Sequence, residues 1–168
     1  MINPNVYLAG PLFGAAELQF NENVAERLEE FADVYLPQRD GGLMRDLVND
    51  GLSPKAAASK VFQSDMEAIN QADYLIAILD GRAIDEGVAF ELGVAYSLEK
   101  RCLGLQTDSR RLTSWGNNPM ITGALEIVLE NVEDLFLWME NETSLISSTG
   151  LLDGGDTSAS VPFSLLEE

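Results

Sequence analysis

Residues 74–80 read Tyr-Leu-Ile-Ala-Ile-Leu-Asp, and the first six of them form the longest apolar run in the chain. A run without polar alternation is typical of a strand that is buried on both faces, as in a parallel sheet covered by helices. The segments on either side, residues 54–72 and 87–100, carry apolar residues at helical spacing. A strand between two helices indicates the βαβ organisation of an α/β fold.

Short apolar runs and longer amphipathic segments alternate over the first 140 residues. We expect strands at residues 6–10, 33–37, 74–80, 102–106 and 135–138, helices at 15–32, 54–72, 87–100 and 121–131, and a loop with a short helical piece (43–48) at 38–53. This order predicts one α/β domain over residues 1–140, with a parallel five-stranded sheet and helices on both faces. Residues 141–168 are rich in Ser, Thr, Gly and Asp, and we expect a tail that is poorly ordered or draped over the body.

The 168 residues include 10 Lys and Arg and 28 Asp and Glu, which give a formal charge of −18. This acidity argues against a nucleic-acid-binding protein, because neutralising phosphates needs a basic surface. It also argues against docking on anionic membranes. The N-terminal residues lack the basic and apolar regions of a targeting signal, and the longest apolar run is far below the roughly 20 residues that span a bilayer. We therefore expect a cytoplasmic protein.

The chain contains no histidine, and Cys102 is its one cysteine. These two facts exclude a Ser-His-Asp triad, a Cys-His pair, a His-based zinc site and an internal disulfide. No GxGxxG or P-loop pattern supports dinucleotide or ATP binding. Acid–base chemistry must therefore fall to carboxylates, Tyr, Lys or water.

Ligands of parallel α/β sheets bind beyond the carboxyl ends of the strands, which draws attention to residues 85–93, Asp-Glu-Gly-Val-Ala-Phe-Glu-Leu-Gly. In a helix that begins at Gly87, Glu91 shares one face with Val88 and Leu92. Burial there raises the pKa of a carboxyl group while the helix N-terminus favours the anion, a combination that suits a desolvated nucleophile. The same position also suits a carboxylate that only contacts the helix start or an arginine.

A second acid, Asp65, shares a predicted helix face with Phe62, Met66 and Ile69. It is either a functional acid among apolar neighbours or a partly exposed residue beside the apolar stripe. Its helix leads directly into the strand at residues 74–80.

Two loop regions hold further candidates. Tyr7 precedes the Gly10-Pro11 turn at the end of the first strand, where it either donates a hydrogen bond to a carboxylate or only packs in the sheet. Asn118 precedes Pro119 and either offers its amide to a ligand or forms a turn before a helix.

Together these segments resemble the nucleoside 2-deoxyribosyltransferase family. The matching segments are VYLAGPLF (6–13), FQSDMEAINQAD (62–73), LIAILDG (75–81), DEGVAFELGVAY (85–96) and NPM (118–120). The resemblance covers roughly residues 5–130, and DEGVAFELG is its most specific part. It implies a flavodoxin-like α/β fold, exchange of a 2′-deoxyribosyl group between nucleobases, and a reaction that needs no metal or organic cofactor.

Carried over by matching position, the resemblance implies a role for each candidate. Glu91 would be the nucleophile that attacks C1′, and Tyr7 would orient its carboxylate. Asp65 and Asp85 would lie at the base, where one of them exchanges a proton with a ring nitrogen. The implied substrate contacts are Gly10, Phe13, Gln38, Asn118 and Met120, the last two reaching the site of a neighbouring subunit in a homo-oligomer.

The implied substrates are a 2′-deoxynucleoside and a free nucleobase, with the chemistry of a retaining glycosidase, a covalent intermediate and ping-pong kinetics. A hydrolase that cleaves deoxynucleosides or their 5′-monophosphates would need the same carboxylates. The loop at residues 11–16 has no Arg or Ser to hold a phosphate, which favours a nucleoside, although Arg39 or a neighbouring subunit could supply the charge. A non-catalytic nucleoside-binding protein on the same fold is the third alternative.

Overall fold

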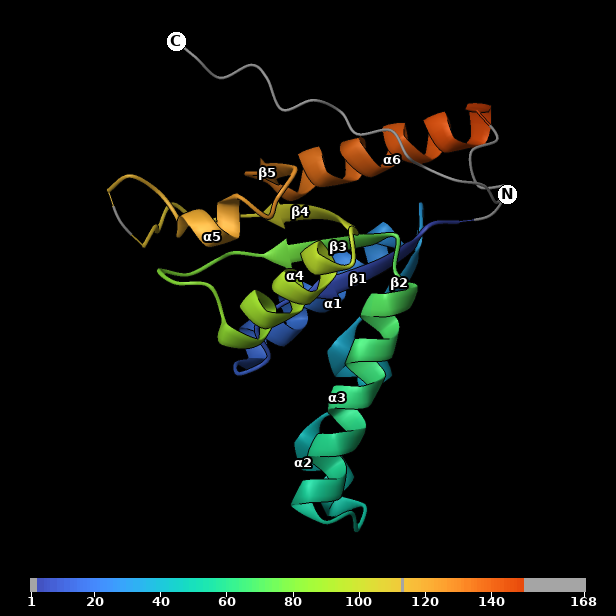
Figure 1. The fold of residues 1–168 in the computed structure, drawn as a ribbon, viewed down its shortest axis with the longest axis vertical. Helices are drawn as coiled ribbons and strands as arrows, with labels where there is room; N and C mark the ends of the chain where they lie inside the picture. Colours follow the sequence, from blue (N-terminus) through green and yellow to red (C-terminus); the bar gives the residue numbers. More distant parts are fainter. Residues whose placement is uncertain (1–2, 113, 150–168) are drawn as a thin grey trace.

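The five strands of the sheet all run parallel, in the order β2-β1-β3-β4-β5, in a computed structural model that describes residues 3–112 and 114–149 (Figure 1). The strands are β1 (Asn5–Ala9), β2 (Asp33–Tyr35), β3 (Tyr74–Ile78), β4 (Arg101–Leu105) and β5 (Ile127–Leu129). The helices are α1 (Ala15–Leu28), α2 (Met44–Asn49), α3 (Pro54–Gln71), α4 (Glu86–Ser97), α5 (Pro119–Thr122) and α6 (Val132–Thr149), with a π-helical turn η1 (Pro37–Gly41) after β2. This architecture confirms the predicted flavodoxin-like α/β fold.

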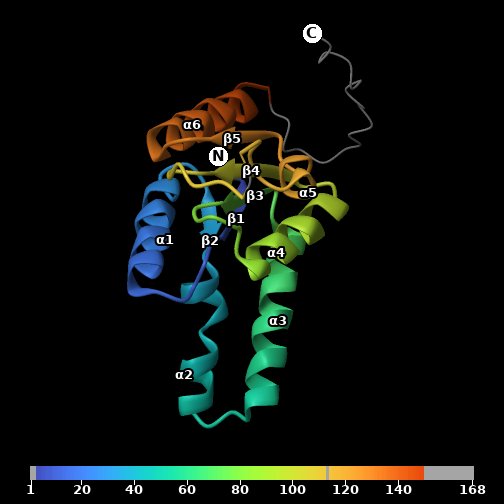
Figure 2. The same ribbon diagram turned by 90° about the vertical axis from the view of Figure 1, so that its left-hand side faces the viewer.

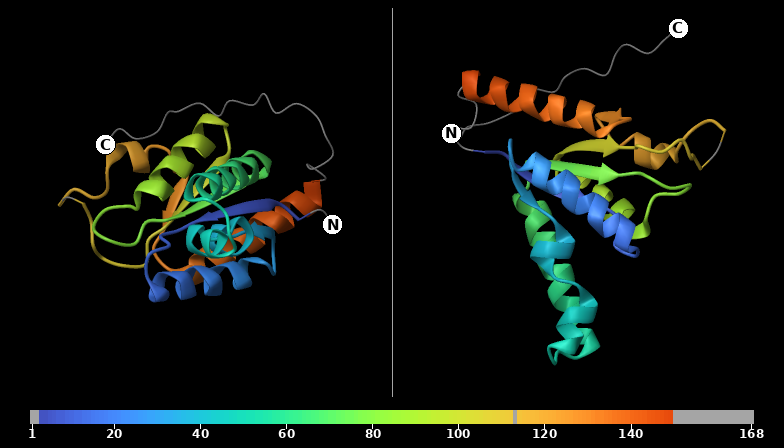
Figure 3. Two further views of the ribbon diagram at one scale, coloured as in Figure 1. Left: turned by 90° about the horizontal axis from the view of Figure 1, so that it is seen from below. Right: turned by 180° about the vertical axis from the view of Figure 1, so that it is seen from behind.

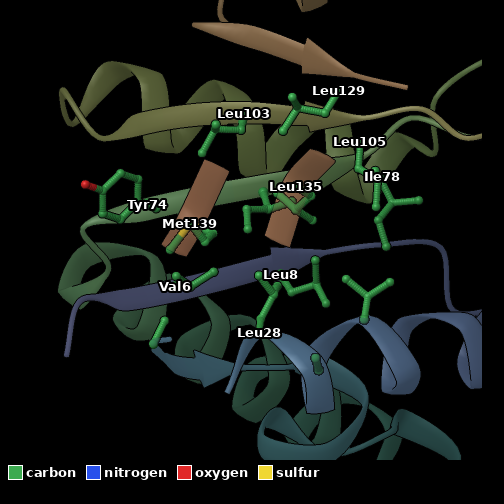
Figure 4. Packing of buried hydrophobic residues seen from close by; sticks show 14 of the residues in the cluster. Val6, Leu8, Leu28, Tyr74, Ile78, Leu103, Leu105, Leu129, Leu135 and Met139 are labelled. Carbon is green, nitrogen blue, oxygen red and sulfur yellow. The ribbon is translucent and has the colours of Figure 1, made fainter. Parts of the chain in front are cut away.

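The sheet is covered on both faces, and each face has its own apolar core. Alternate residues of β1 point to opposite faces. Val6 and Leu8 lie in the core under α1 and α6, where they meet Leu28, Leu135 and Met139 (Figure 4). Helices α1 and α4 lie on opposite faces, as the front and back views show (Figures 1 and 3).

The second core lies under α3 and α4 and holds Tyr7 and Ala9 of β1. Ile69 of α3 and Val88 and Leu92 of α4 pack into it. Every residue of β3 is buried, as the unbroken apolar run at residues 74–80 predicts. Alternate residues of β1 face opposite sides of the sheet, so Tyr7 points to the side covered by α3 and α4. The candidate site therefore lies on that side.

Helices α2 and α3 lie side by side and project from one edge of the sheet as an arm (Figures 1 and 2). Ser53 caps α3 because its hydroxyl accepts a hydrogen bond from the Ala56 amide over 3.2 Å, and Pro54 occupies the first turn. No residue of α2 is buried. No helix within residues 3–112 and 114–149 combines the length and apolar character needed to cross a membrane.

The last third of the chain differs from the sequence prediction. The helix expected at residues 121–131 is instead the short α5, followed by the edge strand β5, in which Ile127 pairs with Leu103 of β4. The apolar residues 121, 125 and 128 mimic helical spacing, but the open edge of β4 provides a hydrogen-bonding partner for Ile127–Leu129 that the local pattern does not reveal.

The strand expected at residues 135–138 is wrong, because these residues lie inside α6. Asn131 begins that helix: its Oδ1 accepts a hydrogen bond from the Asp134 amide over 2.8 Å. Leu135 and Met139, four residues apart, are both fully buried against the sheet. Residues 141–149 of the expected tail continue α6, and residues 150–168 lie outside the described part of the chain.

Candidate active site

The centre of the site is a tyrosine–carboxylate pair between β1 and α4. The Tyr7 hydroxyl donates a hydrogen bond to Oε1 of Glu91 over 2.7 Å. Tyr7 is fully buried in β1, and Glu91 projects from α4 among the buried residues Val88 and Leu92. The alternation of β1 and the periodicity of α4 therefore direct the side chains of Tyr7 and Glu91 into the same space between the sheet and α4.

Burial raises the pKa of Glu91 to about 7, because the surrounding protein solvates the charged form poorly. The hydrogen bond from Tyr7 opposes this by stabilising the anion, and the negative charges of Asp65 and Asp85 add to the upward shift. Burial and the neighbouring carboxylates likewise raise the pKa of Tyr7, so its hydroxyl stays protonated and remains a donor. The pair thus combines a poorly hydrated carboxylate with a fixed neutral donor.

A second tyrosine–carboxylate pair lies beside the first. The Tyr35 hydroxyl of β2 donates to Oδ1 of Asp65 on α3 over 3.1 Å. The rings of Tyr35 and Tyr7 stack, with centroids 5.4 Å apart and planes inclined by 17°. Burial raises the pKa of Asp65, and the hydrogen bond from Tyr35 acts in the opposite direction. The structure thus brings the predicted residues Tyr7, Glu91 and Asp65 together.

Tyr35 is a residue of the site that was not predicted from the sequence. Tyr35 belongs to the expected strand at residues 33–37, which carries no motif. The register of the sheet places Tyr35 directly opposite Tyr7. The strand order would have been needed to find it, because only the pairing of β1 with β2 makes these two tyrosines neighbours.

Asp85 has a structural task at the start of α4. Its Oδ1 accepts hydrogen bonds from the amides of Gly87 (3.0 Å) and Val88 (3.1 Å), which makes it the N-cap of the helix. This N-cap role accounts for an aspartate at the first position of Asp85-Glu86-Gly87, because the cap residue lies just before the first helical turn. Its charge is close enough to raise the pKa of Glu91.

The expected contacts in the loop after β1 lie beside a hollow of about 420 Å³ that is lined in part by Phe13, Asp85 and Arg110. Phe13 is 82% exposed and has room to meet a ligand. Gly10 is buried against Asn21, whose Oδ1 would lie 2.7 Å from a side chain at position 10, so the close approach requires glycine.

Gln38, on η1, points its amide toward α1. Its Nε2 donates to the Leu18 carbonyl over 2.8 Å, and its Oε1 accepts from Nδ2 of Asn21 over 3.1 Å. Nδ2 of Asn21 also donates to the carbonyl of Pro11. These bonds tie η1 to the loop after β1, so Gln38 in this structure supports the wall of the hollow.

Asn118 and Met120 lie on the other side of α4, at α5. Oδ1 of Asn118 accepts a hydrogen bond from the Met120 amide over 3.0 Å and caps the short helix. Met120 is 81% exposed. Asn118 also borders a small pocket of about 130 Å³ next to Leu79 and Ile84. Among the described residues, no group of three or more His, Cys, Asp or Glu side chains is arranged to hold a metal ion.

Similar proteins and a family profile indicate the family of this chain. An uncharacterized protein of Ureaplasma parvum, UU063, is 35% identical over 98 residues, which are 56% of this chain and 61% of that protein. A conserved protein from Enterococcus faecalis, known from a crystal structure, is 29% identical with a TM-score of 0.68 over 83% of this chain and 99% of the other. A 2-deoxyribosyltransferase from Bacillus psychrosaccharolyticus is 25% identical with a TM-score of 0.65 over 79% of this chain and 90% of the other.

The family profile described as nucleoside 2-deoxyribosyltransferase matches residues 6–146. That range runs from β1 into α6 and includes Tyr7, Asp65 and Glu91. The chain therefore belongs to the nucleoside 2-deoxyribosyltransferase family.

Proposed function

We propose that this protein transfers the 2-deoxyribosyl group of a 2′-deoxynucleoside from one nucleobase to another through a covalent intermediate on Glu91. The observation that carries the proposal is the 2.7 Å hydrogen bond from Tyr7 of β1 to Glu91 of α4. Because the pKa of Glu91 is raised to about 7, a useful fraction of this buried carboxylate is ionised near neutral pH. A poorly hydrated, oriented carboxylate is suited to attack carbon.

The proposed reaction follows from the charges that develop as the N-glycosidic bond breaks. Positive charge builds on C1′ and the ring oxygen, and negative charge builds on the departing base. Oε1 of Glu91 is held by Tyr7, so Oε2 forms the bond to C1′ while the C1′–N electron pair leaves with the base. A second base then attacks C1′ and displaces Glu91, which retains the β configuration and gives ping-pong kinetics.

The two aspartates take different parts in this proposal. Asp65 gives a proton to the departing base and recovers it from the incoming one, since its raised pKa keeps the acid form accessible. Asp85 uses Oδ1 to cap α4, which leaves Oδ2 for an amino or N–H group of the base. In this proposal Asp65 therefore transfers the proton, and Asp85 caps α4 and contacts the base.

The ion pairs of two arginines, Arg110 at the 420 Å³ hollow and Arg39 on η1, favour a nucleoside over a 5′-monophosphate. Arg110, on its rim, pairs with Asp108 at 2.5 Å. Arg39 pairs with Glu29 at 2.8 Å and with Asp40 at 3.0 Å. Both arginines are therefore already neutralised within the chain, and an uncharged 5′-hydroxyl suits the site better than a phosphate.

We also propose that neighbouring subunits complete each other's sites. Met120, on α5, is 81% exposed, so a large apolar side chain there can reach a second copy. In this arrangement Asn118 and Met120 contact the sugar bound by the neighbour. The expected setting is the cytoplasm, where base exchange serves nucleoside salvage.

The decisive assay incubates the protein with deoxyinosine, with and without adenine, and separates the products by chromatography. Transfer predicts deoxyadenosine only when adenine is present, with little free hypoxanthine in its absence. Equal release of hypoxanthine in both incubations would identify a hydrolase. No turnover of any deoxynucleoside, with binding retained, would identify a binding protein. The Glu91→Ala variant, with its fold verified by circular dichroism, is the control that should show no transfer.

Subunit sharing has its own test. The variants Glu91→Ala and Asn118→Ala should each be inactive alone. After the two are unfolded together and refolded as mixed oligomers, part of the wild-type transfer rate should return, because some sites then combine an intact Glu91 with an intact Asn118. No recovery in verified mixed oligomers would contradict sharing.

A further inference from the structure

Tyr35 joins the site without belonging to the segments that carry the family resemblance. Its hydroxyl donates to Oδ1 of Asp65 over 3.1 Å, and its ring stacks on Tyr7 at 5.4 Å. Tyr7 in turn donates to Glu91. Two parallel tyrosines thus hold two carboxylates, one on α4 and one on α3, side by side.

The backbone of η1 encloses the Tyr35–Asp65 hydrogen bond. A side chain at Gly41 would bring its Cβ to 2.7 Å from both Oδ1 of Asp65 and the Tyr35 hydroxyl. Gly41 is buried, and η1 is held to the end of β2 because Oδ2 of Asp40 accepts a hydrogen bond from the Leu36 amide over 2.8 Å. The fold therefore leaves room for this hydrogen bond and for no larger residue at position 41.

We propose that Tyr35 is a positioning residue that holds the Asp65 carboxyl group for proton delivery to the departing nucleobase. This inference rests on the proposed function, in which Asp65 is the acid. Because Tyr35 donates to Oδ1, the transferable proton resides on Oδ2. As that proton moves to the base nitrogen, the negative charge left on Asp65 is stabilised by the Tyr35 hydroxyl, which makes Asp65 a stronger acid at the moment of transfer.

Several charged and titratable groups face this carboxyl group. Tyr7 comes from β1, Tyr35 from β2 and Glu91 from α4. Asp40 of η1 acts on Tyr35 and helps to raise the pKa of its hydroxyl. Among them Tyr35 is the group that donates a hydrogen bond to Asp65, so its removal should leave Asp65 protonated to higher pH.

The test compares two donors in the Tyr35→Phe variant. With deoxyinosine, whose base needs a proton, the transfer rate should fall about 10- to 100-fold, the effect of losing a hydrogen bond to a charged acceptor. With 7-methyl-2′-deoxyguanosine, whose cationic base leaves as a neutral molecule without a proton, the rate should fall by less than about twofold. The alkaline limb of the deoxyinosine pH profile should also move to higher pH.

Two further variants make the outcome decisive. Gly41→Ala wedges a methyl group between Tyr35 and Asp65 and should reproduce the donor-selective loss. Tyr96→Phe removes the same hydroxyl from an exposed site on α4 and should change neither donor. Equal losses with both donors and an unmoved pH profile would overturn the role of Tyr35 while leaving transferase activity intact. Absence of transfer in the wild-type protein would overturn the proposed function itself.

Discussion

Tyr7 and Glu91 are 84 positions apart in the sequence, and the Tyr7 hydroxyl donates a 2.7 Å hydrogen bond to Oε1 of Glu91. The contact joins β1 to α4, close to the switch in strand order between β1 and β3, where ligands of this type of sheet bind. It offsets part of the cost of burying Glu91, because it stabilises the ionised form. The pKa of Glu91 is therefore set by burial and the charges of Asp65 and Asp85, which raise it, and by the Tyr7 hydroxyl, which lowers it.

Replacing Tyr7 by Phe should shift that balance. Without the hydrogen bond the pKa of Glu91 should rise further above its present value of about 7. Because the nucleophile must be ionised, the acid limb of the transfer rate should move to higher pH, and the rate at pH 7 should fall about 10- to 100-fold. A pH–rate profile between pH 5 and 9 measures both effects. An acid limb that stays in place would show that another group controls ionisation.

The burial of Glu91 should also appear in the pH dependence of stability. The pKa of Glu91 is about 7 in the folded protein and 4.5 ordinarily. As pH rises from 4.5 to 7, the unfolded chain releases this proton while the folded chain retains it, so the free energy of unfolding falls. The loss amounts to about 3 kcal/mol and is complete above pH 7.

Glu91→Gln removes this loss, because glutamine does not ionise and still accepts the hydrogen bond from Tyr7. The variant should therefore be more stable than the wild type at pH 8, by up to about 3 kcal/mol, and equally stable near pH 4.5. Urea unfolding at a series of pH values measures the difference. A constant difference across this range would mean that Glu91 is not buried as an anion at pH 8. Transfer by the variant should be abolished.

Asp85 provides a way to separate capping from catalysis. Asp85→Ala removes the Oδ1 acceptor of the Gly87 and Val88 amides and should destabilise the protein by roughly 1 kcal/mol. Asp85→Asn keeps that acceptor, so stability should be close to wild type, while transfer falls at least about tenfold if the charge contacts the base. The acid limb should also move to lower pH, because Asp85 raises the pKa of Glu91. Wild-type transfer by a stable Asp85→Asn protein would leave Asp85 only its capping role.

Local sequence patterns predicted β3 and the three elements β1, α3 and α4, which carry Tyr7, Asp65 and Glu91. The unbroken apolar run of β3 and the helical spacing around Asp65 and Glu91 are local signals, and the observed elements match them. The contact between Tyr7 and Glu91 did not follow from these local patterns. It came from the family resemblance, because neither residue's neighbours in sequence reveal the other.

Two of the failures depend on a partner that is distant in sequence. Ile127–Leu129 is a strand because β4 offers an open edge, and Tyr35 joins the site because β2 pairs with β1 in register with Tyr7. Residues 135–138 are apolar enough for either a strand or a helix, and short apolar runs do not distinguish the two. The local signal for α6 is the Asn131–Asp134 cap, which a pattern of apolar spacing does not include.

Arg101 should contribute to stability without affecting transfer. Its guanidinium lies 5.1 Å from the ring centroids of both Tyr74 and Trp138, and it bonds the carboxylates of Glu126 and Glu142. These contacts tie the amino end of β4 to α6. Arg101→Met keeps much of the side-chain length but loses the charge, and it should lower the free energy of unfolding by roughly 1–2 kcal/mol.

The matched control for this variant is Arg45→Met. Arg45 is 76% exposed and pairs only with its neighbour Asp46 among the ion pairs of the described residues, so its loss should change stability by less than about 0.5 kcal/mol. Both variants should transfer deoxyribose at the wild-type rate at 25 °C, because neither contacts the site. Equal stability of the two variants in urea unfolding would show that the contacts of Arg101 with Tyr74, Trp138 and the two glutamates contribute nothing. A reduced transfer rate in a fully folded Arg101→Met protein would instead show that the contacts between β4 and α6 affect catalysis.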